Sequence, residues 1–221
     1  MIVYDDIDSQ ITEKVDLSKN HGRSSFRNLV TQQHHNAFKV FYKFLGDIKP
    51  ARIIEIGTAH GGFTQYLRMV CDTYGLRTHI VSYDIHERDE YAEIRKNNIE
   101  IRVENIFNPD YSNVKQEVID FIQQDSTTLV LCDGGNKIKE FNCLSSYIKP
   151  GDYIMAHDYV IDNKIYRDHY AWKLWNWHEI SESDITGCCM RNNLRDHQRD
   201  VFNHVAWVCK KRGHGDGFTY N

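Results

Sequence analysis

The stretch ARIIEIGTAHGG, residues 51–62, contains a short apolar run, a glycine turn and the start of a second apolar pattern. Residues 52–57 are apolar enough for a buried strand. Gly57 and Gly61 frame a tight turn, where glycine lets the backbone come close to a ligand. The residues behind the turn that are apolar at helical spacing are Phe63, Tyr66, Leu67, Val70 and Tyr74. A strand, a glycine turn and a helix in this order predict the first unit of an α/β sheet.

The same alternation continues along the chain. Strands are predicted at 52–57, 78–85, 99–107, 127–133 and 152–158. Helices are predicted at 37–48, 63–74, 88–97, 114–122 and 138–148. Two later strand-like runs, 185–191 and 204–211, are expected to close the sheet in an antiparallel arrangement. The prediction is therefore a doubly wound, mostly parallel α/β sheet of seven strands with an antiparallel last strand.

The chain is expected to form one main domain with two simple ends. Residues 1–30 are polar and weakly patterned, which predicts an N-terminal arm or lid with one short helix at most. Residues 31–212 carry the α/β pattern. The tail, 213–221, is rich in glycine and is expected to be flexible.

Composition excludes several classes of protein. The chain has 221 residues and a net charge of −4, which does not suggest a nucleic-acid binder. No run approaches the roughly 20 apolar residues of a membrane span, and no secretory signal is expected. The six cysteines form no C-x-x-C pair, and Cys132, Cys188 and Cys209 lie in strand-like runs. Buried free thiols and a cytoplasmic setting are expected, although a redox-active Cys188–Cys189 pair is left open.

The five predicted parallel strands all end in polar or glycine-rich sequence. These ends read EIGTAHGG (55–62), SYDIHE (82–87), ENIFN (104–108), CDGGN (132–136) and AHDY (156–159). Ligands of open parallel sheets bind beyond the carboxyl ends of the strands. The sequence therefore predicts a small-molecule site along this edge.

The turn after the first strand favours one class of ligand over another. A dinucleotide fold would have G-x-G-x-x-G, but Ala59 stands at the second glycine position. Glu55 lies just before the turn, and a carboxylate there suits a cationic ligand better than a diphosphate. Asp84, at the end of the second strand, is placed to accept hydrogen bonds from ribose hydroxyls.

With these motifs, residues 30–211 resemble a class I S-adenosylmethionine-dependent methyltransferase. The resemblance implies that the turn after strand one holds the methionine part of the cofactor, that the acid after strand two holds the ribose, and that residues after strand three flank the adenine. The cofactor-binding residues that it implies are Glu55, Gly57, Thr58, Gly61, Asp84, Asn105, Ile106 and Asp133.

A subgroup is indicated by CDGGNKIKEFNCLSSYIKPGDYIMAHDY, residues 132–159. This stretch is similar to small-molecule O-methyltransferases whose fourth strand ends in DGDH and whose fifth ends in HDY, among them cephalosporin-biosynthesis and macrolide-sugar enzymes. The resemblance implies a divalent metal, Mg²⁺ or Mn²⁺, held by Asp133, His157 and Asp158. The two carboxylates suit Mg²⁺, whereas His157 suits a softer ion or a role as general base.

One position departs from the subgroup pattern, because Asn136 replaces the histidine of DGDH. The catalytic residues considered are Asp133, Lys137 and His157. The base is left open between Lys137, His157 and activation by metal alone, and Lys137 would need a lowered pKa for that role.

Two further stretches have alternative interpretations. The segment QQHH, residues 32–35, either lines the pocket or begins an exposed helix. An aromatic set after the fifth strand is either a substrate cover or a core and dimer contact: Tyr166, Tyr170, Trp172, Trp175 and Trp177.

The resulting prediction is an S-adenosylmethionine-dependent O-methyltransferase that acts, with metal assistance, on a hydroxylated small molecule. No nucleic-acid or membrane partner is expected, and a homo-oligomer is left open. The alternatives are a Rossmann-type NAD(P) oxidoreductase and a non-catalytic S-adenosylmethionine-binding module.

Overall fold

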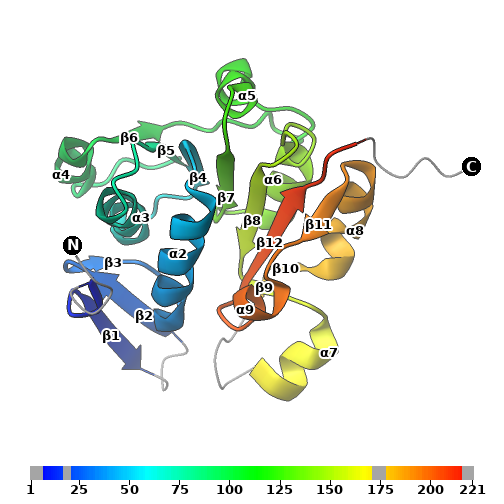
Figure 1. Ribbon diagram of the computed structural model, residues 1–221. Coiled ribbons are helices and arrows are strands. Elements are labelled where there is room, and N and C mark those ends of the chain that lie inside the picture. The colour runs from blue at the N-terminus through cyan, green and yellow to red at the C-terminus, as the bar shows by residue number, and fades with distance from the viewer. Residues whose placement is uncertain (1–6, 17–20, 171–177, 216–221) are drawn as a thin grey trace, which may run out of the picture.

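A seven-stranded sheet forms the centre of the computed structural model (Figure 1), which describes residues 7–16, 21–170 and 178–215. The strand order is β11-β12-β8-β7-β4-β5-β6. Their bounds are β4 (Arg52–Ile56), β5 (His79–Asp84), β6 (Ile99–Val103), β7 (Thr128–Cys132), β8 (Tyr153–His157), β11 (Leu194–Asp196) and β12 (Trp207–Arg212). The five strands from β8 to β6 pair in parallel, and β12 pairs antiparallel with both β8 and β11. The predicted fold class is confirmed.

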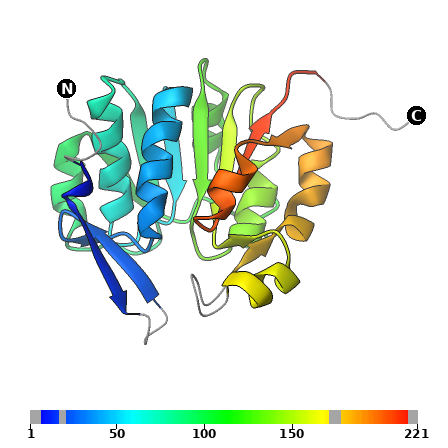
Figure 2. The ribbon, with the colours of Figure 1, turned by 60° about the horizontal axis from the view of Figure 1, so that its bottom comes forward.

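Helices cover both faces of this sheet because its central strands are apolar on both faces. Ile53 of β4 packs into one core and its neighbour Ile54 into the other, as the alternation of side chains along a strand requires. Figure 2 shows α2 (His35–Ile48) and α3 (Gly62–Thr73) side by side on the near face, with the short α9 (Arg199–Asn203). The opposite core includes residues of α5 (Gln116–Gln123), α6 (Lys137–Leu144) and α8 (Glu182–Arg191).

Short elements complete the described chain. Between β5 and β6 lie α4 (Tyr91–Ile94) and η2 (Arg95–Asn97), within the predicted helix at 88–97. After β8 come β9 (Tyr159–Val160), α7 (Asn163–Ile165), η3 (Tyr166–Tyr170) and β10 (Ile180–Ser181), which pairs in parallel with β9. No described helix is long and apolar enough to cross a bilayer.

The N-terminal segment differs from its prediction of one short helix at most. It forms a three-stranded antiparallel sheet of β1 (Ile11–Asp16), β2 (His21–Phe26) and β3 (Leu29–Val30). Its sequence is mostly polar, so the apolar alternation that indicates a strand is missing. Phe26 of β2 enters the main core, where it packs edge-on against Tyr66 of α3. The division of the chain at residue 30 into a lid and a main domain stays a prediction.

The strand predicted at 185–191 is wrong, because these residues lie in α8. A capping box begins this helix: the backbone N–H of Ser181 donates to Asp184 Oδ2 at 2.7 Å. Ile185, Cys188 and Cys189 then occupy one buried helical face. The edge strand is instead β11, while the predicted strand at 204–211 is confirmed as β12.

All six cysteines are free thiols in the structure. Cys132, Cys188 and Cys209 are buried, as predicted, although Cys188 lies in a helix rather than in a strand. The pKa values of the Cys132 and Cys209 thiols are raised by burial, which keeps both in the unreactive protonated form.

Candidate active site

A cavity of about 260 Å³ opens beyond the carboxyl ends of β4, β5, β6 and β7. Small-molecule sites have volumes of roughly 300–1,000 Å³, so this open cavity is slightly smaller than the lower end of that range. Five of the predicted cofactor residues line it: Gly57, Asp84, Asn105, Ile106 and Asp133. The parallel strands bring these residues together from four separate stretches of sequence.

The other three predicted cofactor residues, Glu55, Thr58 and Gly61, do not line this cavity. Glu55 is buried beneath the turn, where its Oε2 accepts hydrogen bonds from Thr64 at 2.6 Å and Ser82 at 2.5 Å. The Thr58 hydroxyl lies 2.6 Å from that of Ser82. Gly61, with φ of +72°, is the N-cap residue of α3. These residues support the turn from behind.

Asp84 connects the turn to the second strand. Its Oδ2 accepts from the backbone N–H of Ala59 at 2.8 Å, and its Oδ1 accepts from that of His86 at 3.0 Å. Gly57 adopts a φ of +95°, and a Cβ added there would overlap the backbone carbonyl of Asp133. The turn after β4 therefore lies directly against the end of β7, and both border the cavity.

The carboxyl of Glu55 should make the stability of the protein depend on pH. Burial raises its pKa to about 7 from 4.5, against the opposing hydrogen bonds from Ser82 and Thr64. The folded protein thus keeps this proton up to about pH 7, whereas the unfolded chain releases it near pH 4.5. The free energy of unfolding should therefore fall by up to about 3 kcal/mol between these pH values. In Glu55→Gln this contribution should vanish, as urea unfolding at pH 5 and pH 8 will measure.

Glu140 provides a second, parallel test, because burial also raises the pKa of its carboxyl to about 7. Its carboxylate accepts from the backbone N–H groups of Gly134 and Asn136, at 3.1 and 3.0 Å. Glu140→Gln should remove a pH dependence of the same sign, and the two effects should add in the double variant. If both single variants keep the pH dependence of the wild type, these carboxyls are ionised in the fold and the prediction fails.

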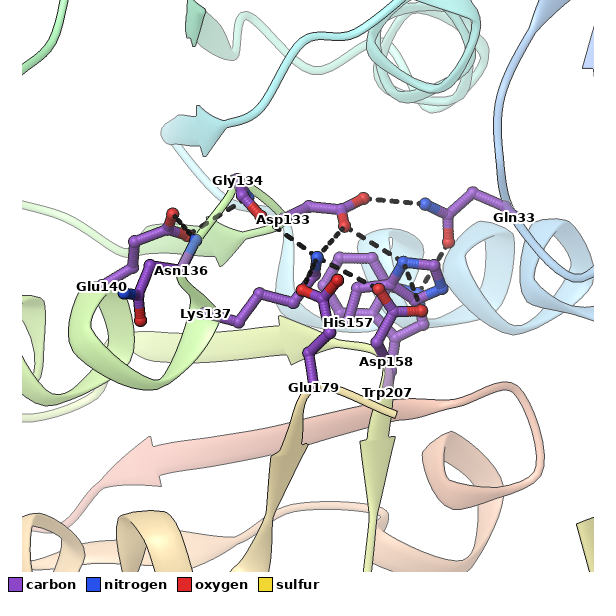
Figure 3. A network of polar contacts seen from close by, with 10 residues as sticks. All are labelled: Gln33, Asp133, Gly134, Asn136, Lys137, Glu140, His157, Asp158, Glu179 and Trp207. Atoms are coloured by element: carbon purple, nitrogen blue, oxygen red, sulfur yellow. Dashed lines mark hydrogen bonds and ion pairs between the residues drawn. The ribbon is translucent and has the colours of Figure 1, made fainter. Parts of the chain in front are cut away.

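A second group of residues lies beside the cavity, where β7 and β8 end (Figure 3). His157 Nδ1 is 3.0 Å from Asp133 Oδ1 and 3.7 Å from Asp158 Oδ1. Asp158 ends the strand with a left-handed φ of +55°, a conformation that concentrates at functional sites. Burial lowers the pKa of His157, but Asp158 and Asp133 raise it more, so the net pKa lies above the ordinary value. Asp133 thus belongs to both the cavity and this cluster.

The Lys137 side chain extends into the same cluster from the first residue of α6. Its Nζ is 3.0 Å from Asp158 Oδ2, 3.7 Å from Asp133 Oδ1 and 2.7 Å from Glu179 Oε2. Burial lowers the pKa of Lys137, but the three carboxylates raise it by more, so the net pKa lies well above the ordinary value. A lysine that acts as a base near neutrality needs the opposite shift.

The predicted metal ligands have suitable atoms and spacing, yet their surroundings do not fit a bound metal. Ligand atoms of Asp133, His157 and Asp158 lie within 4.8 Å of one another. The ammonium of Lys137 already pairs with two of these three residues. A divalent ion on the same oxygens would lie against a buried like charge, which opposes its binding.

Several residues of the site were missed or left undecided by the sequence interpretation. Gln33 is fully buried: its Nε2 donates to Asp133 Oδ2 at 2.9 Å, and its Oε1 accepts from Trp207 Nε1 at 2.8 Å. Trp207 lies opposite His157 on β12, and the two rings stack 4.9 Å apart. Gln33 therefore enters the site, whereas His34 caps α2 by accepting from Asn36 N–H.

Asn136, the departure from the DGDH pattern, has a structural role. Its side chain caps α6 by accepting a hydrogen bond from the backbone N–H of Lys139 at 3.2 Å. Of the aromatic set after β8, Tyr166 is buried and stacks on His178. Trp172, Trp175 and Trp177 lie outside the described residues, as does the side chain of Tyr170. The substrate cover stays a prediction.

Comparison with known proteins identifies a family and solved structures of the same fold. A family model described as rhamnosyl O-methyltransferase/CmcI matches residues 8–179. The apo structure of CmcI superposes with a TM-score of 0.63 at 14% identity, covering 86% of this chain and 76% of that one. CmcI with Mg-SAM gives 0.57 at 15% identity, covering 85% and 75%.

A more distant neighbour is an O-methyltransferase family protein from Burkholderia thailandensis. It superposes with a TM-score of 0.51 at 12% identity, and the match covers 81% of this chain and 56% of the neighbour's chain. A search of curated proteins finds no match. At such low identities the solved structures establish the shared fold, and the family model carries the assignment of the chain.

Proposed function

The chain belongs to the rhamnosyl O-methyltransferase/CmcI family and is an S-adenosylmethionine-dependent O-methyltransferase, and from this premise we propose how its residues divide the reaction. We assign cofactor binding to the cavity at the ends of β4 to β7, and the acceptor hydroxyl to the neighbouring cluster around Asp133. The observation that carries this proposal is the position of Asp133, which faces the cavity and is hydrogen-bonded to His157.

The cavity offers different chemistry to each part of the cofactor. Asp84 presents its carboxylate at the cavity wall, where it can accept hydrogen bonds from ribose hydroxyls. Ile106 and Phe107 supply buried apolar surface for a flat heterocycle. The turn at Gly57 exposes backbone to the methionine part, and the carboxylate of Asp133 faces the same space, where it would favour the cationic sulfonium.

Methyl transfer requires the acceptor hydroxyl to lose its proton as its oxygen bonds to the methyl carbon, while the bond from that carbon to the sulfonium sulfur breaks and S-adenosylhomocysteine leaves. His157 and Asp133 share a hydrogen bond and can hold that proton between them. Lys137 keeps its own proton and provides positive charge close to the carboxylates. The family's description names a rhamnosyl acceptor, which supports a sugar or a similar hydroxylated small molecule as the acceptor here.

Asp84→Ala should weaken the binding of S-adenosylhomocysteine about 10- to 100-fold. Hydrogen bonds to a charged group contribute about 1.5–3 kcal/mol each, and the variant also frees the backbone N–H of Ala59 from its partner. Isothermal titration calorimetry with the purified protein measures the change.

The control is Asp89→Ala, which removes an exposed carboxylate from the same loop and should bind like the wild type. Screening hydroxylated acceptors with labelled S-adenosylmethionine then tests turnover. Failure of the wild type to bind S-adenosylhomocysteine would refute the proposal. Binding without turnover on any sugar or phenol would instead favour the non-catalytic binding module.

A further inference from the structure

The ammonium of Lys137 lies at the centre of the cluster where the family resemblance implies a divalent cation (Figure 3). Its hydrogen-bonding partners include Glu179 Oε2 at 2.7 Å and the Gly134 carbonyl at 3.1 Å. Asp158 Oδ2 lies 3.0 Å away and Asp133 Oδ1 lies 3.7 Å away. The lysine side chain is 6% exposed, so these oxygens, rather than water, surround the charge.

The surroundings of this ammonium are of the kind that a hard metal ion takes. Carboxylate and carbonyl oxygens are the ligands of Mg²⁺ and Ca²⁺ in proteins. Here Asp158, Glu179 and the Gly134 carbonyl present such oxygens to one Nζ. Two of the three candidate metal ligands, Asp133 and Asp158, are also partners of Lys137. One cation, and not two, fits among these groups.

Local sequence explains why the charge is held in place. Lys137 follows the helix cap Asn136 directly, and the turn before it is fixed by Glu140, which accepts from the N–H groups of Gly134 and Asn136. The base of the lysine is therefore anchored on a capped helix. Its tip bridges β8, through Asp158, to Glu179, which comes from 42 residues further along the chain.

From this arrangement we propose that the Lys137 ammonium is the resident cation of the site and that this protein binds no divalent metal there. Lys137 is then a positioning residue that neutralises and orients Asp133 and Asp158 for the acceptor. The role toward the acceptor rests on the proposed function, whereas the replacement of the metal rests on the cluster alone.

The proposal is tested by metal binding, with Mn²⁺ as the probe. The wild type should leave the electron paramagnetic resonance signal of free Mn²⁺ unchanged, and its Tm should be the same in EDTA and in millimolar Mn²⁺ or Mg²⁺. Lys137→Met removes the charge and leaves three carboxylates, so it should gain Mn²⁺ binding and an EDTA-reversible rise in Tm of about 5 °C or more.

Two matched variants separate the buried charge from a general effect of mutation. Lys137→Arg keeps a cation and should stay unresponsive to Mn²⁺. Lys96→Met makes the same chemical change at an exposed lysine, which pairs with Glu93, and should behave like the wild type. If Lys137→Met does not fold, Lys137→Gln, with a polar head of similar reach, takes its place.

Binding of Mn²⁺ by the wild type at this cluster, removed in Asp158→Asn, would overturn the proposal. So would Lys137→Met or Lys137→Gln that folds yet gains no affinity for Mn²⁺. Titration of the same samples with S-adenosylhomocysteine keeps the two ideas apart. If the wild type does not bind S-adenosylhomocysteine, the proposed function is refuted. The Mn²⁺ data still decide the role of Lys137.

Discussion

Gly57→Ala should destabilise the fold by about 3–5 kcal/mol and abolish the binding of S-adenosylhomocysteine. Gly57 has a φ of +95°, and an added Cβ would overlap the Asp133 carbonyl and lie 2.8 Å from Gly134 N. Both contacts are with backbone, so the end of β7 must move away from the turn, at a cost that adds to the strain of the conformation. Thermal unfolding should show a fall in Tm on the order of 10 °C.

Gly75→Ala is the matched control for this prediction. Gly75 also has a positive φ, of +66°, but nothing lies within 4 Å of a Cβ there. Gly75→Ala should therefore lose only about 1 kcal/mol of stability, from the strained backbone conformation. Gly75 also does not line the cavity, so nucleoside binding should not change. If both variants lose the same stability and keep nucleoside binding, the close approach of the turn to β7 is not important.

Asp133→Asn should lower the rate of methyl transfer about 10²- to 10⁴-fold while nucleoside binding changes less than about 10-fold. The carboxylate accepts from Gln33 on one oxygen and lies 3.0 Å from His157 on the other. Gln33 must present its NH₂ group to Asp133, because its Oε1 accepts from Trp207. The amide of the variant would therefore turn a donor toward either Gln33 or His157, and the proton-holding pair is lost.

The measurement compares turnover of the acceptor found for the wild type with binding of S-adenosylhomocysteine. Asp120→Asn is the control, since Asp120 is an exposed residue of α5 that contacts Gln116. Turnover equal to that of the wild type in Asp133→Asn would show that this carboxylate takes no part in the chemistry.

The central sheet could be predicted because its central strands, β4, β7 and β8, are buried and mainly apolar on both faces, and helices alternate with the parallel strands along the chain. Five of the eight predicted cofactor residues line the cavity for a related reason, since the ends of parallel strands meet at one edge. The segment 185–191 misled the interpretation because its buried Ile185, Cys188 and Cys189 also suit a strand. The S-x-x-D capping box at Ser181–Asp184 was the signal that could have identified the helix.

Other parts of the site carry no local signal. The sheet of β1, β2 and β3 is built from mostly polar sequence, so no apolar alternation marks its strands. Gln33 reaches Asp133 across 100 residues, and Glu179 reaches Lys137 across 42. Contacts between residues so far apart in sequence depend on how the loops pack in the folded protein. The periodicity of side chains along the chain does not predict them. The paired acids were visible in the sequence, but the buried cation between them was not.

The hydrogen bond between Gln33 and Trp207 joins positions 174 residues apart. One partner precedes α2, and the other begins the last strand of the sheet. During synthesis from the N-terminus, Trp207 therefore leaves the ribosome 174 residues after Gln33, and Asp133 and His157 acquire this support only then. A contact between positions so far apart in sequence also carries the entropy cost of closing a long loop, which slows folding. The order of synthesis thus delays completion of the active site until the sheet that carries it can be closed.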